Sequence, residues 1–539
     1  MLNRRLVFLL PLAAALAAWG ALPEPPRERV STEFPAQSGT TLRVAADCSD
    51  LQAKIDGARP GDTILIPAGA TCTGNFILRN KGAGAGWIVI QTDTPLPSPG
   101  SRMTPDKAGR LARIVTANSN PAIRTEPGAR YYRLTGLEIT SSVAPPGMVY
   151  DLISFGDGSQ AQRTLEAAPA YLIIDRCYIH GSPRQRIKRA VALNSAHSAV
   201  IDSYFSEIHA PGVDSQAICG WNGPGPFRIE NNFLSASTEN VMFGGATGFI
   251  PGIVPSDIEI RGNHFYKPLS WKKDHPSFAG EAWVIKNLLE FKNARRVIVE
   301  ENVFENTWDG FAVLFTVRTQ GTSMPWNMVE DISVTTNLFR HAGGGMNILA
   351  HDDESGNQGV TQRLAFRNNL FEDIDRTRWG GRGVSFLILS GPPDITIDHN
   401  TIFGSGCMVL ADSSRPAVRF VFTNNLGTGD ICSAAGKGLG TNALEYHFPG
   451  AVVTHNVFAG AKESLYPPGN FFPANLNMIH FANPAASDYR LTGGPYKGAG
   501  TDGLDLGADI EAVKRAAEAA MGGSRQSRPL VREPSRRTR

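Results

Sequence analysis

Short segments in which apolar and polar residues alternate recur along most of the chain, and many of them end in Asn-x-Phe or a close variant. Alternation with a period of two is typical of a β-strand that buries one face. Eight such segments can be stacked on one another: 228–233, 259–265, 297–304, 332–339, 364–371, 395–403, 420–426 and 452–458. Glycine and proline are spread between them, so many short strands and many turns are expected.

The asparagines of these segments fall at nearly regular intervals of 32, 39, 35, 32, 31, 25 and 31 residues, a spacing typical of a solenoid with variable loops. The aligned residues are Asn231, Asn263, Asn302, Asn337, Asn369, Asn400, Asn425 and Asn456. Coils of a parallel solenoid stack about 4.8 Å apart, so an inward Asn at each bend would bond to the next coil. We therefore predict an all-β fold, a single-stranded right-handed parallel β-helix with an Asn ladder, in which Cys177 and Ser203 take the Asn position in earlier coils.

A second set of strand-like segments precedes the first by a short turn, which predicts two strands per coil. These segments are 216–220, 240–244, 287–293, 311–318, 346–351, 385–390 and 407–411. An open solenoid end exposes apolar side chains and unpaired backbone groups. Residues 48–66 are interpreted as an N-terminal helical cap with Leu51 and Ile55 on one face, followed by the first strand. Residues 481–509 are expected to close the opposite end.

The first 20 residues have the layout of a secretory signal peptide: two arginines, an apolar run over 6–18 and a small-x-small triplet. An uncleaved anchor is the alternative. No later segment is long and apolar enough to cross a membrane. We expect a linker over 21–42, the β-helix over 43–510 and a basic, disordered tail over 511–539 in a protein that is secreted, periplasmic or on the cell surface.

Charge and cysteine content narrow the function classes. The formal net charge is +2, and the last 29 residues hold eight Lys/Arg against three Asp/Glu, so the rest is close to neutral and a nucleic-acid partner is poorly supported. The six cysteines permit disulfides in an exported chain, and the pairs Cys48–Cys72 and Cys407–Cys432 could join neighbouring coils. Cys177 and Cys219 are interpreted as buried thiols. A monomer is expected.

Several motifs resemble the pectate-lyase-like superfamily of secreted parallel β-helix proteins. They are Leu-Gln-Ala at 51–53, Pro-Gly-Asp-Thr-Ile at 60–64, the Asn-x-Phe repeats and Gly-Ala-Gly-Thr-Asp-Gly at 498–503. Residues 239–245, 268–271, 286–287 and 290–294 look like a bacterial exported branch of right-handed β-helix repeat proteins. The resemblance spans residues 43 to about 510. It implies the fold, and action on a polysaccharide, usually uronate-containing, by β-elimination or hydrolysis.

Uronate elimination needs a base for the proton next to the carboxylate and positive charge to stabilise the resulting anion. In 287–293, Leu289 and Phe291 are assigned inward, so Glu290 and Lys292 share the outer face. We take Lys292 as the base. The assigned supporting residues are Glu290 or His351, and the assigned anion stabilisers are Lys286 and Arg318. The alternative is an exposed ion-pair ladder of Glu290 and Lys292 without chemistry.

Neighbouring coils extend these residues into a polar ridge on which an extended polysaccharide could lie. Asp214, Gln216 and Glu239 are the candidate substrate-binding residues, and Trp271 and Trp308 are candidates to stack on a sugar ring. No residue is assigned as a metal ligand and no cofactor is required, although Ca²⁺ is left open. Two alternatives to a lyase stay open: a non-catalytic glycan-binding protein, and a structural cell-surface protein tethered by its basic tail.

Overall fold

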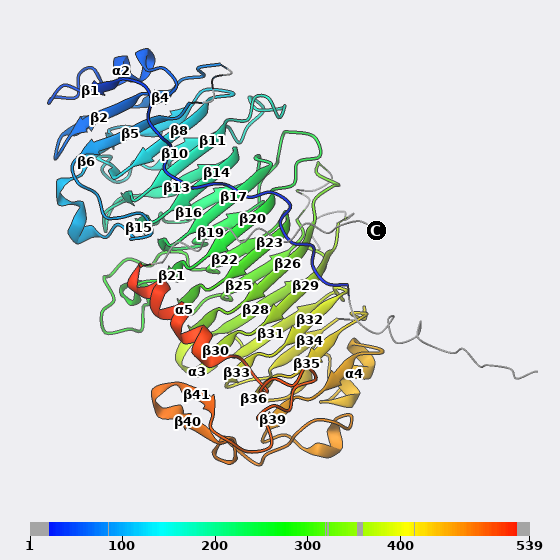
Figure 1. The fold of residues 1–539 in the computed structure, drawn as a ribbon. Coiled ribbons are helices and arrows are strands. Elements are labelled where there is room, and N and C mark those ends of the chain that lie inside the picture. Colours follow the sequence, from blue (N-terminus) through cyan, green and yellow to red (C-terminus); the bar gives the residue numbers. More distant parts are fainter. Residues whose placement is uncertain are drawn as a thin grey trace, which may run out of the picture.

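The wall of the molecule consists of three parallel sheets, here called A, B and C, that the chain visits in turn as a right-handed β-helix (Figure 1). The structure is a computed structural model that describes residues 21–524 except 83, 85, 319, 321–322, 353–358 and 414. The signal peptide predicted over 1–20 lies outside the described residues, as does the tail beyond 524. The predicted β-helix is confirmed, but a coil has three strands rather than two. Each Asn-containing segment bends at its Asn and supplies one strand to sheet A and the next to sheet B.

In the described residues, sheet A has 14 strands, sheet B has 13 and sheet C has 12. Sheet A contains β1 (Thr41–Arg43), β2 (Thr63–Pro67), β5 (Ile88–Asp93), β8 (Arg130–Thr135), β11 (Ala170–Asp175), β14 (Ala196–Ile201), β17 (Gly225–Glu230), β20 (Ser256–Arg261), β23 (Ala294–Glu300), β26 (Val329–Thr335), β29 (Thr361–Arg367), β32 (Ile395–Asp398), β35 (Val421–Thr423) and β38 (Val452–Thr454).

Sheet B contains β3 (Thr71–Thr73), β6 (Ala112–Thr116), β9 (Leu137–Ser141), β12 (Tyr178–His180), β15 (Tyr204–Ile208), β18 (Phe233–Ala236), β21 (His264–Tyr266), β24 (Val303–Thr307), β27 (Leu338–Ala342), β30 (Leu370–Ile374), β33 (Thr401–Gly404), β36 (Leu426–Thr428) and β39 (Val457–Ala459). Sheet C contains β4 (Phe76–Leu78), β7 (Ile123–Thr125), β10 (Val149–Phe155), β13 (Ile187–Leu193), β16 (Gln216–Gly220), β19 (Val241–Phe243), β22 (Leu289–Phe291), β25 (Val313–Thr316), β28 (Gly344–Leu349), β31 (Val384–Leu389), β34 (Val409–Asp412) and β37 (Ile431–Ser433).

The interior is a continuous apolar core in which equivalent side chains of successive coils lie on one another. Phe304 and Phe339, for example, stack with ring centroids 4.7 Å apart, and Phe371 continues the stack at 4.8 Å. Period-two alternation in parallel, in-register strands produces this arrangement, because the same face of every strand points inward.

The Asn ladder is present at the bend between sheets A and B. Each side-chain oxygen accepts from the backbone N–H and the side-chain amide of the Asn one coil earlier; Asn337, for example, accepts from Asn302 at 2.9 and 3.0 Å. The ladder runs through Asn232, Asn263, Asn302, Asn337, Asn369, Asn400, Asn425, Asn456 and Asn470. Ser203 and Cys177 continue it, as predicted.

The assignment of Asn231 to this ladder was wrong, because Asn232 occupies the position. Asn231 has φ 54° and is the left-handed turn residue that precedes the ladder residue, as Glu301 (φ 59°) does before Asn302. Asn, Asp and Gly tolerate that conformation best. With two adjacent asparagines the sequence spacing alone does not distinguish the turn residue from the ladder residue.

Both ends of the coil stack are covered. At the N-terminal end α2 (Leu51–Gly57) buries Leu51 and Ile55 on the core, and the predicted disulfide Cys48–Cys72 joins its start to β3. At the other end α4 (Thr441–His447) and Tyr466 complete the core, and Cys407–Cys432 links adjacent coils.

Residues 481–509 do not complete this core, contrary to expectation. They include β40 (Phe481–Asn483) and β41 (Asp488–Leu491), and they pack on the outer face of sheet B in a separate cluster around Leu426 and Val457.

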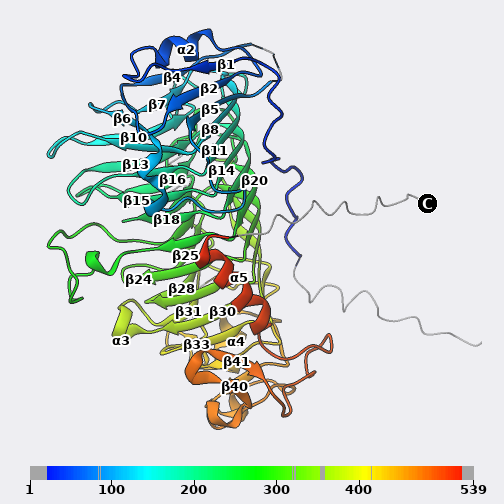
Figure 2. The same cartoon turned by 60° about the vertical axis from the view of Figure 1, so that its left-hand side comes forward.

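The beginning of the described chain lies along sheet A instead of forming a free linker (Figure 2). We call residues 21–40 the strap; they contain no helix or strand, and Thr41–Arg43 already pairs with β2. Backbone N–H groups of the strap donate to three aspartates: Ala21 to Asp394 at 2.9 Å, Glu24 to Asp331 at 3.1 Å and Arg27 to Asp257 at 2.8 Å. Three extended residues rise about 9.3 Å, nearly the spacing of two coils, so the strap meets one aspartate every second coil.

The aspartates that hold the strap alternate with arginines on successive coils. We call the row Asp257, Arg296, Asp331, Arg363, Asp394 and Arg419 the Asp/Arg column. Each Arg pairs with the Asp of the preceding coil through two bonds of 2.6–2.9 Å. All six residues have φ between 51° and 61°. This left-handed conformation forms a local bulge that turns each side chain outward.

The C-terminal segment predicted to be disordered begins with a helix. α5 (Ile510–Gly522) is capped by Asp509 and buries Ile510, Val513, Ala517 and Ala520 against Val303, Leu338 and Leu370 on the outer face of sheet B. Spacings of three and four residues place these apolar side chains on one face of the helix. In the ranges that the structure describes, no helix is long and apolar enough to span a membrane.

Candidate functional site on sheet C

The predicted polar ridge lies on sheet C, where strand register places its members on neighbouring coils. Ile218 is paired with Val241, and Val241 with Leu289, so Gln216, Glu239 and Asn287 occupy equivalent positions on three coils. Leu289 and Phe291 are in the core, as expected, and Glu290 and Lys292 are on the other face. Figure 1 shows β16, β19, β22, β25 and β28 side by side in the middle of the molecule.

Lys292 and Glu290 form an ion pair within one strand segment. Lys292 Nζ lies 2.8 Å from Glu290 Oε1, and the side chains are only 11 % and 4 % exposed. The other carboxylate oxygen accepts from Asn287 Nδ2 at 3.2 Å. The candidate base is therefore held in place by a carboxylate that is itself hydrogen-bonded, and both side chains are largely shielded from solvent.

Glu239 is a buried carboxyl group of this face with a raised pKa. It is fully buried and accepts from Gln216 Nε2 at 2.8 Å through Oε2, whereas Oε1 has no hydrogen-bond partner among the described residues. Burial raises its pKa to about 7, and the negative charges of Glu290 and Asp214 act in the same direction. A carboxyl group with a raised pKa beside other charged groups is typical of functional sites.

Lys267 lies behind this carboxyl group and is also fully buried. Its ammonium donates to the backbone carbonyls of Ala236, Ser237 and Thr238. Burial lowers its pKa, against the opposing charge of Glu239. The sequence pattern gave no reason to single out Lys267, which follows a strand as one more polar residue before a proline.

Lys286 and Asp214 form the more exposed edge of the ridge. Lys286 Nζ lies 2.7 Å from both carboxylate oxygens of Asp214, and these side chains are 42 % and 40 % exposed. Burial alone would lower the pKa of Lys286, but the hydrogen bond to Asp214 and the charge of Glu239 outweigh it and raise the pKa. Asp214, Gln216, Glu239, Lys286, Glu290 and Lys292 are thus brought together.

Arg318 and His351 lie on the following coils. The backbone N–H of Arg318 donates to the carbonyl of Lys292 at 3.1 Å, and its guanidinium donates to Asp352 at 2.6 Å. Thr316 pairs with Leu349, so His351 is level with Arg318 one coil further on. Arg318 directly precedes residue 319, which is outside the described ranges, and His351 lies two residues before the undescribed segment 353–358.

The two candidate tryptophans are not equivalent platforms for a sugar. Trp271 is only 4 % exposed and packs edge-on against His209, with ring centroids 5.5 Å apart, so it offers little surface on which a sugar could stack. It ends the short helix η2 (Leu269–Trp271) and is the buried residue of that helix. Trp308 is half-buried directly after β24.

The row of polar residues also extends in the other direction. Arg189 is paired in register with Gln216 and with Asp151, and its guanidinium bonds to Asp151 at 2.9 Å and lies 4.6 Å above the ring of Trp221. Burial raises the pKa of Asp151, which Arg189 opposes. Extending the predicted ridge by two coils toward the N-terminus would have identified Arg189 and Asp151.

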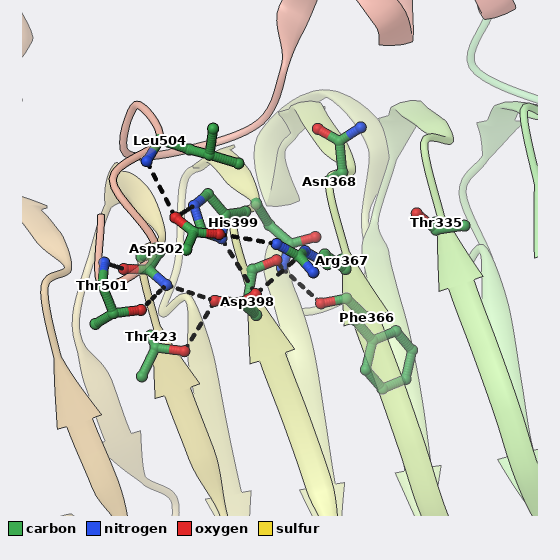
Figure 3. A network of polar contacts seen from close by, with 12 residues as sticks. Thr335, Phe366, Arg367, Asn368, Asp398, His399, Thr423, Thr501, Asp502 and Leu504 are labelled. Atoms are coloured by element: carbon green, nitrogen blue, oxygen red, sulfur yellow. Dashed lines mark hydrogen bonds and ion pairs between the residues drawn. The ribbon is translucent and has the colours of Figure 1, made fainter. Parts of the chain in front are cut away.

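The motif at 498–503 has a structural role (Figure 3). Asp502 lies 3.1 Å from the guanidinium of Arg367 and 3.3 Å from His399, and Thr501 exchanges two hydrogen bonds with Asn424. Asp398 completes the network with Arg367, His399 and Asn424. These contacts fasten the C-terminal segment to the bend between sheets A and B.

In the described part of the chain, no group of three or more His, Cys, Asp or Glu side chains is arranged to hold a metal ion. The three carboxylates of the ridge are instead interspersed with lysines and amides.

Comparison with known proteins adds a likeness of fold. No protein-family model and no curated protein matches the chain. The solved structures that resemble it include a mannuronic-acid-specific polysaccharide family 6 lyase from the human gut microbiota, with 13 % identity, 89 % of this chain and 98 % of that chain covered, and a TM-score of 0.45.

Two further solved structures have lower TM-scores. An alginate lyase from a Paenibacillus strain has 14 % identity, covers 73 % of this chain and 98 % of its own, and has a TM-score of 0.32. A family 28 exopolygalacturonase from Yersinia enterocolitica has 10 % identity, coverage of 81 % and 78 %, and a TM-score of 0.33. At such identities the likeness concerns the fold and assigns no role to any residue.

Proposed function

We propose that this protein is an exported polysaccharide lyase that cleaves a uronate-containing glycan by β-elimination on the outer face of sheet C. The observation that carries the proposal is the poorly exposed Lys292–Glu290 pair beside Glu239, a buried carboxyl group with a raised pKa. Charged groups under such electrostatic stress destabilise the folded state, so a functional role is the best reason for their presence.

In the proposed reaction Lys292 removes the proton on the carbon next to the uronate carboxylate. The electron pair left behind forms a carbon–carbon double bond while the bond to the glycosidic oxygen breaks, and that oxygen takes a proton from water at the exposed edge. Lys286 and Arg318 stabilise the anionic intermediate. The product is an unsaturated uronate at the new chain end.

In the proposed reaction Glu290 is the residue that positions Lys292 as the base. The two groups are in contact at 2.8 Å and almost excluded from water. Asn287 keeps Glu290 in position during the transfer.

The direct test is to incubate the purified protein with a panel of uronate-containing glycans and follow the ultraviolet absorbance of the unsaturated product. We expect absorbance to rise with at least one glycan and the Lys292→Ala variant to be inactive. The assignment is falsified if every glycan stays intact, or if Lys292→Ala retains full activity.

A non-catalytic glycan-binding protein is the second candidate, because both lysines of the ridge are engaged in ion pairs. It predicts saturable binding of an acidic glycan with unchanged chain length. Lys286→Ala is the suitable variant, because Lys286 lies at the exposed edge whereas Trp271 is buried. Weaker binding by this variant without any cleavage by the wild type would favour the second candidate.

A further inference from the structure

We propose a second saccharide site, for an uncharged glycan, in a pocket of about 620 Å³ on the outer face of sheet B. Its floor is formed by β27, β30 and β33, one wall by α3 (Arg376–Trp379) and the other by residues near β41. The volume lies within the range of about 300–1,000 Å³ that is typical of ligand pockets. The pocket belongs to a different sheet from the Lys292 ridge, and the proposal does not rest on the lyase reaction.

The pocket exists because β27 and β30 each contain a bulge. His341 (φ 56°) and Asp373 (φ 56°) have left-handed backbone conformations in the middle of their strands. A bulge turns two successive side chains outward, so Arg340 with His341, and Glu372 with Asp373, line the floor together. In a regular strand one member of each pair would point into the apolar core.

The two carboxylates of the floor are held by donors from both walls. Glu372 accepts from the hydroxyl groups of Tyr489, at 2.9 Å, and Ser487. Asp373 accepts from His341 Nδ1 and from the indole N–H of Trp379, each at 2.8 Å. Burial would raise the pKa of Asp373, but these hydrogen bonds and the Arg378 guanidinium outweigh it and lower the pKa.

This charge pattern points to an uncharged ligand. Arg378 pairs with Asp373, and Arg340 pairs with Glu305 at 3.0 Å, so the cations of the pocket are already matched by carboxylates. A uronate would have to compete with these carboxylates for the same arginines. Sugar hydroxyls both donate and accept, so they can add to the fixed carboxylates and cations without displacing any of them.

The pocket also offers an apolar surface for a sugar ring. Phe403 and Tyr489 contact each other with centroids 4.5 Å apart, and Ile374 and Leu476 adjoin the same space. An aromatic ring beside hydrogen-bonding groups is a surface on which the C–H face of a sugar can stack. Tyr489 combines both properties, because its hydroxyl is fixed by Glu372.

The wall that carries Ser487 and Tyr489 is fixed on both sides. Arg490 bonds to Glu511 at the start of α5, at 2.8 Å, and the Asp502 network in Figure 3 fastens the segment that follows β41. The site is therefore pre-formed, which lowers the entropic cost of binding.

The fluorescence of Trp379 should report binding in the pocket, because its indole donates to Asp373 and its ring lies 5.3 Å from His341. Full-length protein is titrated with neutral gluco-, galacto-, manno- and xylo-oligosaccharides while tryptophan fluorescence is recorded. We expect a saturable change with at least one of them and its loss in Trp379→Phe. Tyr489→Ala and Arg378→Ala should each weaken binding about tenfold or more.

Two control variants make the outcome decisive. Arg376→Ala changes an exposed arginine of the same helix that does not line the pocket, and Lys292→Ala changes the ridge on sheet C. Both should bind as tightly as the wild type, whether or not the protein is a lyase. The proposal is overturned if no neutral saccharide gives saturation, if only uronates do, if Lys292→Ala abolishes the signal, or if Arg378→Ala and Tyr489→Ala bind unchanged.

Discussion

Sheets A and C both carry charged side chains across successive coils, but the two sheets differ in how completely those charges are paired. In the Asp/Arg column of sheet A the signs alternate, and each aspartate also accepts a backbone N–H from the strap. Burial would raise the pKa of Asp331, yet the bonds from Arg363 and from the strap outweigh it and lower the pKa. Every charge in this column stabilises its neighbours.

The ridge on sheet C instead gathers three carboxylates, Asp214, Glu239 and Glu290, within electrostatic reach of one another. The pKa of Glu239 is raised rather than lowered, and one of its oxygens has no hydrogen-bond partner in the described part of the chain. Alternating charges satisfied by the backbone indicate a structural role, whereas a buried carboxyl group with a raised pKa among other charged groups indicates a site retained for another purpose.

The largest expected difference between the two sheets is in activity. Lys292→Ala should lower turnover of a uronate glycan by about 10²–10⁴-fold, the usual contribution of a general base. It should also lower the melting temperature, because Glu290 is left buried without its counter-charge. Arg363→Ala in the Asp/Arg column should lower the melting temperature and leave turnover unchanged. Product absorbance and thermal unfolding of both variants check this, and comparable activity losses in the two would remove the distinction between the sheets.

The pH dependence of stability should have opposite signs for the two sheets. The lowered pKa of Asp331 gives stability that is present above its unfolded pKa and lost as the pH falls through its folded pKa. The raised pKa of Glu239 gives stability that is complete below about 4.5 and is lost as the pH rises to about 7.

Glu239→Gln should therefore remove a slope worth up to about 3 kcal/mol between pH 4.5 and 7. Urea midpoints across this range measure it, and Lys267 does not interfere because its lowered pKa acts above the window. An unchanged slope in the variant would show that Glu239 is ionised throughout.

Removing the charge of a single carboxylate should weaken the attachment of the strap to sheet A. Asp331→Asn removes the charge that holds both Arg363 and the Glu24 N–H, and should lower the free energy of unfolding by about 1–2 kcal/mol. Arg363 keeps Glu330 as a partner, which limits the loss. Limited proteolysis should cleave the strap faster in this variant than in Asp412→Asn, an exposed aspartate on sheet C. Equal cleavage rates would argue against strap fastening through Asp331.

The smallest effect is expected at the exposed edge of the ridge. Lys286→Ala breaks a pair that is about 40 % exposed on both sides, so unfolding should change by less than about 1 kcal/mol. kcat for the glycan should nevertheless fall, because Lys286 stabilises the anionic intermediate in the proposed reaction, and the effect should diminish at high salt because exposed charges are screened. A rise in KM with constant kcat would instead restrict Lys286 to substrate binding.

The repeat in the sequence was sufficient to predict the fold, both disulfides and the Asn ladder except at one position. Period-two alternation determines which face of Leu289–Phe291 is buried, and hence that Glu290 and Lys292 lie outside. Composition was a poor guide for 511–539, where basic residues beyond 524 concealed the apolar spacing of Ile510, Val513 and Ala517.

The contacts of the ridge could be predicted only in part. Neighbouring strands were foreseeable, so Asp214, Gln216 and Glu239 were found together with Lys286 and Lys292. The burial of Lys267 and Trp271 depends on loops between sheets B and C whose paths no periodicity describes. The pocket on sheet B depends on bulges and on a segment more than 100 residues away, Ser487 to Glu372, which strand alternation does not reveal.

The strap also constrains the order of events during folding. Ala21 is separated by 373 residues from Asp394, its partner, so this contact must wait until the coil that carries Asp394 has formed. Contacts of such sequence separation form slowly, and domains fold during synthesis from the N-terminal end. The strap is therefore among the last segments to dock, and the solenoid is fastened along its length only after nearly all of its coils are in place.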